Sequence, residues 1–390
     1  MTTPKTIAMV AAARPNFMKI TALSAAFRNY PGVFTANIIH TGQHYDYYMS
    51  KVFFEELKLP QPVAHLDVGS GPHGMQTGRV LERFERYLLD HPPDLVMVVG
   101  DVNSTIAAAL AAAKLHIPVA HIEAGLRSGD RRMPEELNRL LTDHLADILY
   151  TPSPDAEWNL RAEGILGEKI VFVGNVMVDT LLSSLPQADD STLLDRLQLT
   201  PGEYAVLTMH RPENVDDWHQ LRLLAELIDQ VCRILPLVFP IHPRSAKNLS
   251  SLLSQANWDK IVANTELRLI DPLGYIDFLC LQKNARVVLT DSGGIQEETT
   301  VLGIPCLTLR DSTERPITVT HGTNTVVGLN PGRVVDLLGG VSQAKTVTDR
   351  PAKWDGRAAE RIVRHLMEYF NCRPAEDITP ARRLTSKVTA

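Results

Sequence analysis

The stretch Leu289-Thr290-Asp291-Ser292-Gly293-Gly294-Ile295-Gln296-Glu297-Glu298 is the part of the chain that most clearly indicates the fold. The apolar run 287–289 is typical of a buried strand, and the two glycines are typical of a tight turn into a helix. Free N–H groups at such a helix N-terminus bind phosphate, and Glu298 would lie one turn beyond Gly294 on the same face. The glycine pair alone fits any strand-to-helix turn. Together with Glu298 it predicts a nucleotide or nucleotide-sugar site.

Working outward from this stretch, apolar runs alternate with amphipathic or alanine-rich segments along the chain. The expected strands are 7–12, 33–40, 95–99, 117–122, 148–150, 169–173, 204–209, 237–241, 267–270, 287–289 and 306–309. The expected helices include 17–27, 76–89, 105–114, one that begins at Pro134 with Leu137, Leu140 and Leu141 on one face, 221–235 and 357–370. Such alternation predicts an α/β fold with parallel, doubly covered sheets, here two Rossmann-like domains facing across a cleft.

The length of 390 residues suits two domains of ordinary size. We expect the first over residues 1–175 and the second over 176–355, with the segment from Gly174 to about Ser191 as their connection. A final helix is expected over 356–371. The polar, basic stretch 372–390 is expected to be a mobile tail.

Composition excludes several classes of protein. A net charge of −6, with 44% hydrophobic and 22% charged residues, argues against a general nucleic-acid binder. The four cysteines are far apart without a CxxC pair, which predicts reduced thiols rather than disulfides or a zinc site. No signal-peptide pattern opens the chain, and no apolar run is long enough to insert into a membrane. The cytoplasm is therefore the expected compartment.

Unusual polar residues fall at or just after the ends of apolar strands. They are Arg14, Asp101, Glu123, His210, His242 and Ser292. Each has an ordinary alternative: Asp101 could cap the next helix, for example, and Glu123 could pair with Arg127. Because ligands bind at the carboxyl ends of strands in open α/β sheets, the shared position favours one binding cleft.

Charge suggests roles for these residues. Arg14 and Lys19 would suit a pyrophosphate, although either could be a solvated surface charge. Asp101, Glu123 and Glu135 are three carboxylates on separate loops. If they share one pocket, their mutual repulsion and their burial would raise the pKa of at least one of them and make it a proton-transfer group.

Two of these assignments have local alternatives. Glu135 could instead form a surface pair with Arg139, four residues further along the same helix. His210 and His242 could neutralise a leaving diphosphate or move protons. The spacing of His40 and His44 crosses a glycine-containing loop, so we expect no metal site there.

Several motifs, taken together, resemble the non-hydrolysing UDP-N-acetylglucosamine 2-epimerases over residues 7–370. The motifs are Arg14-Pro15 with Lys19, Gly100-Asp101, His121-Ile122-Glu123-Ala124-Gly125-Leu126-Arg127, Pro134-Glu135-Glu136 with Asn138-Arg139, His210-Arg211, Thr290 to Glu298, and Arg310-Asp311 with Thr313-Glu314-Arg315-Pro316.

The resemblance implies the glycosyltransferase-B architecture, with the active site between the domains and the last helix returning to the first domain. It implies interconversion of UDP-GlcNAc and UDP-ManNAc, by elimination of UDP to 2-acetamidoglucal and its re-addition after the C2 proton returns on the opposite face. The expected product would supply ManNAc units for surface polysaccharide. It implies a homodimer, and it implies neither a cofactor nor a metal.

Position by position, Asp101, Glu123 and Glu135 match the family's catalytic carboxylates, and His210 matches its active-site histidine. The expected UDP-binding residues are Arg14, Lys19, His242, Tyr275, Ser292, Gly293, Gly294, Glu298 and Arg315. Gln43 and His44 match part of the site at which bacterial members bind a second UDP-GlcNAc as an activator.

Some positions depart from the family pattern. Asn16 stands where many members have an acidic residue, and Val102-Asn103-Ser104 stands where many have three threonines. The stretch 41–44 and Arg127-Ser128 are similar to a sister group that epimerises UDP-2,3-diacetamido-glucuronic acid, while the intact 313–316 favours UDP-GlcNAc. A UDP-sugar glycosyltransferase of the same fold and a non-catalytic UDP-sugar sensor are further alternatives, but neither needs three carboxylates.

Overall fold

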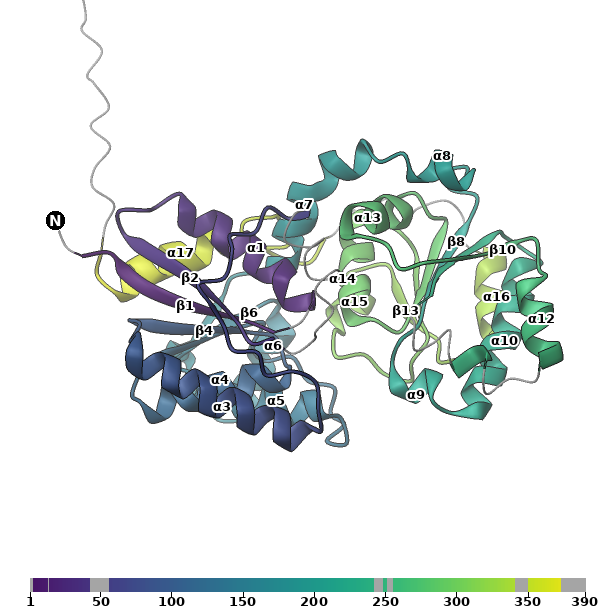
Figure 1. The fold of residues 1–390 in the computed structure, drawn as a ribbon. Coiled ribbons are helices and arrows are strands. Elements are labelled where there is room, and N and C mark those ends of the chain that lie inside the picture. The colour runs from purple at the N-terminus through teal and green to yellow at the C-terminus, as the bar shows by residue number, and fades with distance from the viewer. Residues whose placement is uncertain are drawn as a thin grey trace, which may run out of the picture.

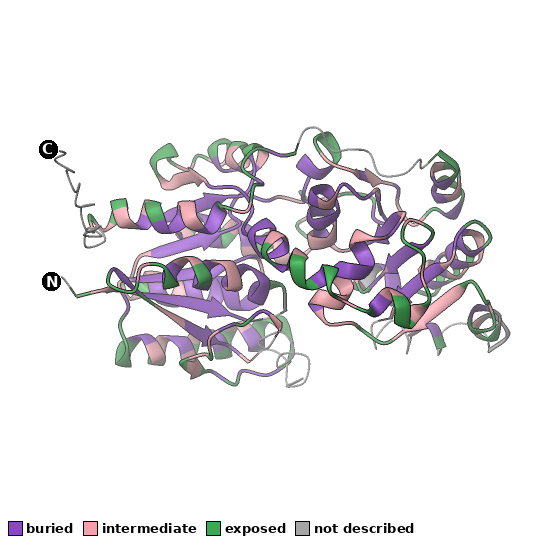
Figure 2. Cartoon of the chain, turned by 90° about the horizontal axis from the view of Figure 1, so that it is seen from above, coloured by how far each residue is buried: buried purple, intermediate pink, exposed green. Residues whose placement is uncertain are grey.

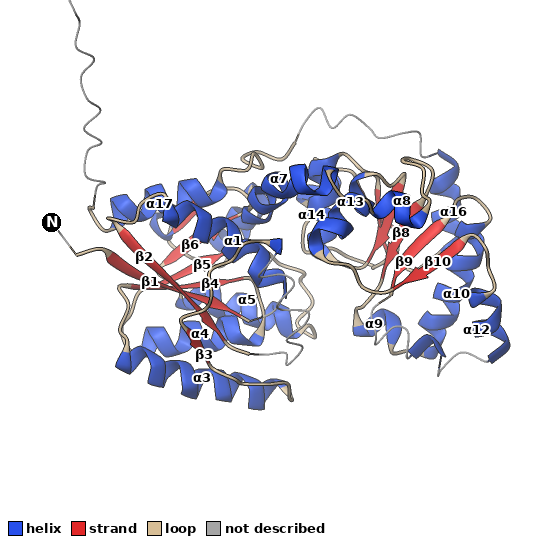
Figure 3. Cartoon of the chain, turned by 45° about the horizontal axis from the view of Figure 1, so that its top comes forward, coloured by secondary structure: helices blue, strands red, loops and turns tan. Residues whose placement is uncertain are grey.

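The structure is a computed structural model that describes residues 3–12, 14–42, 56–241, 248–250, 255–340 and 350–372. It has two lobes, each built on one parallel β-sheet with helices on both faces (Figures 1 and 3). We call the lobe with the seven-stranded sheet the first lobe and the lobe with the six-stranded sheet the second lobe. The predicted α/β fold with two Rossmann-like sheets is confirmed.

Strands and helices alternate along the first lobe. The elements are β1 (Lys5–Ala11), α1 (Arg14–Arg28), β2 (Phe34–His40), β3 (Ala64–His65), α3 (His73–Asp90), β4 (Leu95–Val99), α4 (Asn103–Lys114), β5 (Val119–Ile122), α5 (Pro134–Leu145), β6 (Ile148–Thr151), α6 (Pro154–Ala162), a 3-10 turn (Gly167–Lys169) and β7 (Ile170–Phe172). Two helices then lead to the second lobe, α7 (Val176–Asp189) and α8 (Leu193–Leu197).

The second lobe repeats the order. Its elements are β8 (Ala205–Thr208), α9 (Pro212–Val215), α10 (Trp218–Cys232), β9 (Leu237–Pro240), α12 (Gln255–Val262), β10 (Leu267–Ile270), α13 (Tyr275–Lys283), β11 (Val287–Thr290), α14 (Gly293–Leu302), β12 (Cys306–Thr308), α15 (Ile317–Thr320), β13 (Asn324–Val326) and α16 (Pro331–Gly340). The chain ends its regular structure in α17 (Ala358–Tyr369). Every strand expected from the sequence has a counterpart, and the short β3 and β13 were not expected.

Strand side chains alternate between the two faces of each sheet, as the period of two requires. In β1, Ile7 and Met9 belong to the core beneath α1, whereas Ala8 and Val10 belong to the core on the opposite face. The strands inside the two sheets, such as β4, β5 and β11, are accordingly buried along their whole length, whereas the edge strands β7 and β10 are only partly buried (Figure 2). Burial on both faces is why the strands read as continuous apolar runs.

The order of strands fixes where a ligand fits. The sheets run β3-β2-β1-β4-β5-β6-β7 and β10-β9-β8-β11-β12-β13, all strands parallel. In each sheet the order reverses at the central pair, β1/β4 or β8/β11. Such a switch point leaves a crevice at the carboxyl ends of the strands, where ligands of open α/β proteins bind.

The segment expected to be a plain connection between the lobes contains the 14-residue helix α7. The Oδ1 atom of Asn175 caps it by accepting a hydrogen bond from the Met177 N–H at 2.9 Å. Its apolar side packs on α1, and the Thr180 hydroxyl donates to the Met18 carbonyl at 2.6 Å. The same core cluster includes Tyr275 of α13, so apolar packing continues from one lobe to the other through α7.

The last helix, α17, lies against α1 and α7 of the first lobe. Ile362 and Leu366 are fully buried there. The chain already contacts the first lobe ahead of the helix, because the Trp354 indole N–H donates to the Pro152 carbonyl at 2.9 Å. The first lobe is therefore covered by residues from both ends of the chain (Figure 1).

Candidate active site

Residues from both lobes meet where the strands end. Lys19 of α1 and Glu123, just after β5, form an ion pair in the first lobe. Arg315, which follows β12 in the second lobe, donates from Nη2 to the other Glu123 carboxylate oxygen at 2.7 Å. All three side chains are buried. The structure thus brings together three of the predicted site residues.

Arg315 is held by carboxylates on its other sides as well. Its Nε lies 2.9 Å from Glu297 Oε1 and its Nη1 lies 3.1 Å from Glu314 Oε1. Although burial alone would lower its pKa, these two carboxylates raise the pKa of Arg315 above its usual range. The guanidinium is therefore a permanent cation in a fixed orientation.

Glu314 joins three guanidinium groups into one network. It accepts from Arg211 at 3.1 Å and from Arg310 at 2.7 Å in addition to its contact with Arg315. Burial alone would raise its pKa, but the three arginines hold the pKa of Glu314 far below its ordinary value. The network leaves a net positive charge that suits a diphosphate.

Lys19 titrates closer to neutrality than an ordinary lysine. Burial lowers the pKa of Lys19 to about 8, against the opposing effect of the Asp101 charge. Its ammonium group also lies beside Gly100, where a β-carbon would come within 3.2 Å of Nζ. Gly100 has a φ of +67°, so both the close approach and the backbone favour glycine at the end of β4.

Glu123 itself has a left-handed backbone, with a φ of +70°. Its N–H and that of Ala124 both donate to the Tyr150 carbonyl at 3.1 Å. Two residues on, a β-carbon at Gly125 would lie 2.3 Å from the Ala156 carbonyl oxygen of α6. A non-glycine residue in this conformation is uncommon, and here the neighbouring strand and helix hold the strained turn that presents the carboxylate.

A buried histidine supports that turn from behind. His121 is fully buried, with Nδ1 2.6 Å from Asp143 Oδ1 and Nε2 2.8 Å from the Gly100 carbonyl. Both partners are acceptors, so the ring is held from both of its nitrogens. Asp143 also accepts from the Gly125 N–H and from Arg127. The sequence motif around Glu123 is thus explained by a charged core that fixes the loops carrying Asp101 and Glu123.

Asp101 pairs with the buried Arg139 of α5, whose other partner is Glu136 at 2.8 Å. Glu136 in turn accepts from the backbone of Ser128 and Gly129. Asp101 does not cap α4, whose N-cap is Val102. Nor does Glu123 pair with Arg127, which binds Glu163 and Asp143.

Glu135 lies in the first turn of α5 and is half-buried. It makes no hydrogen bond or ion pair with any residue that the structure describes. The surface pair with Arg139 considered for it is wrong, since Arg139 binds Glu136 and Asp101. The structure brings Asp101 and Glu123 to Lys19, but it does not place Glu135 in contact with them.

His210 follows β8, and Asp291 holds it in place. The His210 side chain is half-exposed, and its Nδ1 lies 3.0 Å from Asp291 Oδ1. Asp291 is fully buried and also accepts from the His210 N–H, the Arg211 N–H and Asn214 Nδ2. Burial would raise the pKa of Asp291, but these donors and the His210 charge lower it. The sequence places Asp291 in the turn before α14 but does not indicate that it holds His210.

The glycine turn forms the N-terminus of α14, as predicted. Ser292 is its N-cap but makes no side-chain cap bond, so the first N–H groups of α14 are not capped by a side chain. A β-carbon at Gly293 would lie 2.4 Å from Arg315 Nη1, so glycine lets the guanidinium rest against the helix end. Glu298, one turn on, accepts from the Tyr275 hydroxyl at 3.1 Å.

Some predicted residues lie outside what the structure describes. These are Gln43, His44, His242, the side chain of Arg14 and the tail beyond Cys372. Asn16, which departs from the family pattern, has a structural role: it accepts from the Ala12 N–H and donates to the Val99 carbonyl at 3.0 Å. It thereby ties the start of α1 to the ends of β1 and β4.

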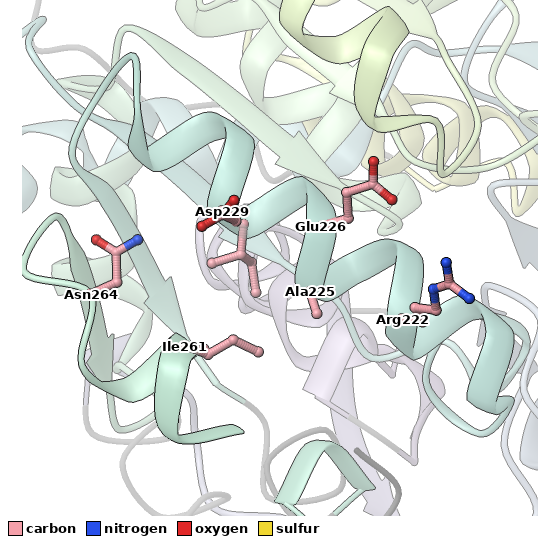
Figure 4. A pocket seen from close by; sticks show the side chains of 7 residues that line it. Arg222, Ala225, Glu226, Asp229, Ile261 and Asn264 are labelled. Carbon is pink, nitrogen blue, oxygen red and sulfur yellow. The ribbon is translucent and has the colours of Figure 1, made fainter. Parts of the chain in front are cut away.

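A hollow of about 240 Å³ lies away from this site, between α10 and α12 on the outer side of the second lobe (Figure 4). Its charged side chains already have partners: Gln230 donates to Glu226, and Arg233 pairs with Asp229. It contains none of the predicted site residues.

In the described ranges, no group of three or more histidine, cysteine or acidic side chains is arranged to hold a metal ion. No helix in those ranges has both the length and the hydropathy needed to cross a membrane.

Known proteins resemble the chain over almost its full length. The family model for UDP-N-acetylglucosamine 2-epimerases matches residues 26–367. A UDP-N-acetylglucosamine 2-epimerase of Methanocaldococcus jannaschii is 43% identical over 371 residues, which cover 92% of this chain and 98% of the relative. A UDP-2,3-diacetamido-2,3-dideoxy-D-glucuronate 2-epimerase of Pseudomonas aeruginosa is 40% identical over 364 residues, covering 92% and 99%.

The crystal structure of the Methanocaldococcus jannaschii UDP-GlcNAc 2-epimerase, in complex with UDP-GlcNAc and UDP, has the same fold. It matches with a TM-score of 0.85 at 42% identity, and the match covers 93% of this chain and 99% of that one.

Proposed function

Because the chain belongs to the UDP-N-acetylglucosamine 2-epimerase family, we propose that it interconverts UDP-GlcNAc and UDP-ManNAc. A carboxylate removes the proton from C2 while the C1–oxygen bond breaks, which gives 2-acetamidoglucal and UDP. A proton is then added to C2 on the opposite face, and UDP is added back to C1. Atoms balance without water or an oxidant.

One observation carries the proposal: a buried carboxylate, Glu123, is held between two cations of the diphosphate site, Lys19 and Arg315. In the free protein these cations neutralise the carboxylate. A bound diphosphate would draw both cations to itself and leave Glu123 free to take a proton. Substrate binding would thus prepare the base next to the bond that breaks.

The other site residues have complementary roles in this proposal. Asp101 is the second acid–base group for the other face of C2, with Glu135 as the third carboxylate. The N-terminus of α14, at Ser292 to Gly294, binds the diphosphate, and Glu298, supported by Tyr275, binds sugar hydroxyls of the nucleotide. His210, positioned by Asp291, stabilises the departing UDP.

The test is to incubate the protein with UDP-GlcNAc in D2O and to follow the sugar by NMR. We expect deuterium at C2 and the appearance of UDP-ManNAc. Substrate returned without exchange would overturn the proposal. Free ManNAc with UDP would indicate a hydrolysing enzyme, and transfer of the sugar to an added acceptor would indicate a glycosyltransferase.

Variants test the residues. Asp101→Asn and Glu123→Gln should lose at least about a hundredfold in kcat while they keep UDP binding. Glu157→Gln, a carboxylate of α6 that pairs with Arg161, is the control and should keep normal turnover. Normal turnover in both site variants would contradict the assignment.

A second substrate has a specific observation in its favour, the 40% identity to the diacetamido-glucuronate 2-epimerase. Both sugars react at C2 and differ at C3 and C6. Parallel D2O assays with the two UDP-sugars decide between them, and we expect UDP-GlcNAc to have the higher kcat/KM.

We also propose that the enzyme is a homodimer that uses the outer face of α5. Leu137 and Leu141, four residues apart on this helix, are 39% and 57% exposed. Apolar side chains gathered on an outer helix face are typical of a protein interface. A second copy of the chain is the expected partner.

A cytoplasmic location is part of the proposal. All four cysteines are free, and Cys232, Cys280 and Cys306 are buried. Burial raises the pKa of Cys232 and of Cys306 to about 12, which keeps these thiols protonated and unreactive. Such cysteines are typical of proteins from reducing compartments.

A further inference from the structure

The side chain of Asn175, between β7 and α7, has a function that capping does not account for. It is 3% exposed, and its Oδ1 accepts from the Met177 N–H at 2.9 Å. Because only the oxygen of an amide side chain accepts a hydrogen bond from an N–H group, this contact fixes the orientation of the Asn175 amide. The Nδ2 group therefore points the other way, and it is buried without a hydrogen bond to any residue that the structure describes.

An unpaired amide donor is costly inside a protein. Burying such a group without an acceptor disfavours the folded state by about 1–3 kcal/mol. A residue that only capped α7 could be serine or threonine, which carry no second polar group to bury. The free donor therefore indicates an acceptor that is bound only in the working enzyme.

The position of Asn175 suggests what that acceptor is. Asn175 lines a small hollow of about 10 Å³ at the ends of β5, β6 and β7, the β5–β7 hollow. Its other lining residues are Lys19, Ile122, Glu123, Pro152, Gly174 and Val176. The hollow has room for about one water molecule or one methyl group. It combines a carboxylate, an ammonium group, an amide donor and three apolar side chains.

We propose that Asn175 is a specificity-determining residue, whose Nδ2 donates a hydrogen bond to the carbonyl oxygen of the substrate's 2-acetamido group. This inference rests on the proposed function, in which Glu123 removes the proton from C2. The acetamido group is attached to that same carbon, so it lies close to the Glu123 carboxylate when that carboxylate reaches C2. Glu123 is one of the residues that line the β5–β7 hollow.

The hollow matches the methyl group of an acetamido group in size, and Asn175 offers a donor for the neighbouring carbonyl oxygen. The acetamido oxygen is an acceptor and needs the Asn175 donor. Its methyl group suits the apolar side chains of Ile122, Pro152 and Val176. UDP-glucose has a hydroxyl at C2 and would leave both the donor and the apolar wall unfilled, which is how a hydrogen-bonding site rejects an analogue.

The experiment compares three nucleotides on the full-length protein and two variants. Isothermal titration calorimetry gives the affinity of UDP-GlcNAc, UDP-glucose and UDP for the wild type, Asn175→Ser and Asn175→Asp. Serine and aspartate both keep an oxygen to cap α7, and both remove the amide donor. If the serine variant folds poorly, the near-isosteric aspartate variant still provides the comparison.

We expect the preference for UDP-GlcNAc over UDP-glucose to fall about tenfold in both variants, while UDP affinity stays within about twofold in Asn175→Ser. An equal loss for all three ligands would show that Asn175 only caps α7, and would overturn the inference. An unchanged preference would do the same and would assign the hollow to a structural water.

The D2O assay on the wild type separates this inference from the proposed function. If the wild type exchanges deuterium at C2 but the variants keep their preference, only the role of Asn175 fails. If the wild type does not exchange, the proposed reaction fails, and the calorimetry still decides whether Asn175 recognises the acetamido group.

Discussion

Lys19 makes UDP binding depend on pH. Its pKa of about 8 lies below the ordinary lysine value, so the ammonium form is lost as pH rises through about 8. A diphosphate favours the charged form and would raise this pKa again. We predict that UDP binding takes up a proton near pH 8–9 and that UDP affinity falls above pH 8, by up to about tenfold per pH unit.

Calorimetry in buffers of different ionisation enthalpy measures this proton uptake. Lys19→Met should weaken UDP binding at pH 7 and abolish the pH dependence. Lys114→Met, at an exposed position of α4, is the control and should behave like the wild type. Proton uptake that persists in Lys19→Met would assign the titration to another group.

Asp291 is expected to act through His210. Because the carboxylate holds Nδ1 of the imidazole at 3.0 Å, Asp291→Asn should lower kcat by at least about tenfold with a smaller change in UDP affinity. The double-mutant cycle with His210→Ala gives the sharper test. Once His210 is absent, Asp291→Asn should change kcat little further.

The thermal midpoint of each variant shows how much of the effect is structural, since Asp291 also binds two backbone N–H groups. Equal effects of Asp291→Asn with and without His210 would mean that the carboxylate only stabilises the loop.

At the residue scale the sequence singles out Glu123 as a polar residue at the end of a strand, and the family resemblance points to Lys19 and Arg315. The structure brings these three side chains into contact. Asp291 and Glu297 were missed because their partners, His210 and Arg315, lie elsewhere in the chain. Asp291 did carry a signal, a charged residue directly after a buried strand.

Among the elements, α5 shows why periodicity can mislead. Its leucines recur at helical spacing, which ordinarily marks the buried face. In the structure Leu137 and Leu141 are exposed, whereas Glu136, Arg139 and Asp143 are buried. The polar side chains are inside because they hold the loops around Asp101 and Glu123. The spacing of the leucines therefore indicates the helix correctly, but it does not indicate which face of the helix is buried.

The exposed leucines lead to a prediction about assembly. Leu141→Glu places a charge in the proposed interface and should shift the protein from dimer to monomer, measured by light scattering after size-exclusion chromatography. Its thermal midpoint at low concentration should change little, because the side chain is exposed within one chain. Ile234→Glu, at an exposed position of the second lobe, should leave the dimer intact. A monomeric wild type would contradict the proposal.

Asp179 of α7 links stability to pH through α17. It accepts from the Ala358 N–H at 3.1 Å and the Ala359 N–H at 2.7 Å, and burial raises its pKa to about 6 despite these bonds. The folded-state pKa lies above the unfolded value, so the folded state holds the proton more tightly. The contribution of Asp179 to stability is therefore largest below about pH 4 and is lost as pH rises through about 6.

Denaturant unfolding at pH 5 and pH 7 measures this effect. The wild type should gain about 1 kcal/mol from Asp179 on going from pH 7 to pH 5. Asp179→Asn should lack this gain, so the difference between variant and wild type should depend on pH. A difference that is the same at both pH values would contradict the assignment.

Helix α7 shows the limit of prediction for elements. Its sequence lies between Gly174 and a polar stretch at 189–191 and contains Pro186, all of which suggest a connection. The helix forms because it packs on α1, α13 and α14 at once. Such tertiary support overrides local propensity, and one sequence window does not contain it.

For the whole molecule, the contact between Glu123 and Arg315 joins the two lobes. A diphosphate has to compete with Glu123 for Arg315 and Lys19. We predict that Glu123→Gln, which keeps the size of the side chain and removes its charge, binds UDP about fivefold more tightly than the wild type while turnover is lost. Glu157→Gln should leave UDP affinity unchanged. Weaker UDP binding in Glu123→Gln would show that the ion pair does not compete with the ligand.

The two-sheet architecture was predictable, because buried parallel strands leave continuous apolar runs that are easy to recognise. The strand order and the meeting of the lobes at Glu123 and Arg315 were accessible only through family resemblance, since they depend on pairings between residues 192 positions apart. Local sequence patterns contain no information at that range.

The chain passes between the lobes twice, first through α7 and again between α16 and Lys353. Two connections restrict how the lobes can turn relative to one another more than a single connection would. We therefore expect the two lobes to keep one alignment of their facing residues. The proposed reaction separates UDP from 2-acetamidoglucal and has to rejoin them at C1. Two connections between the lobes would help to keep both fragments in the relative position from which they started.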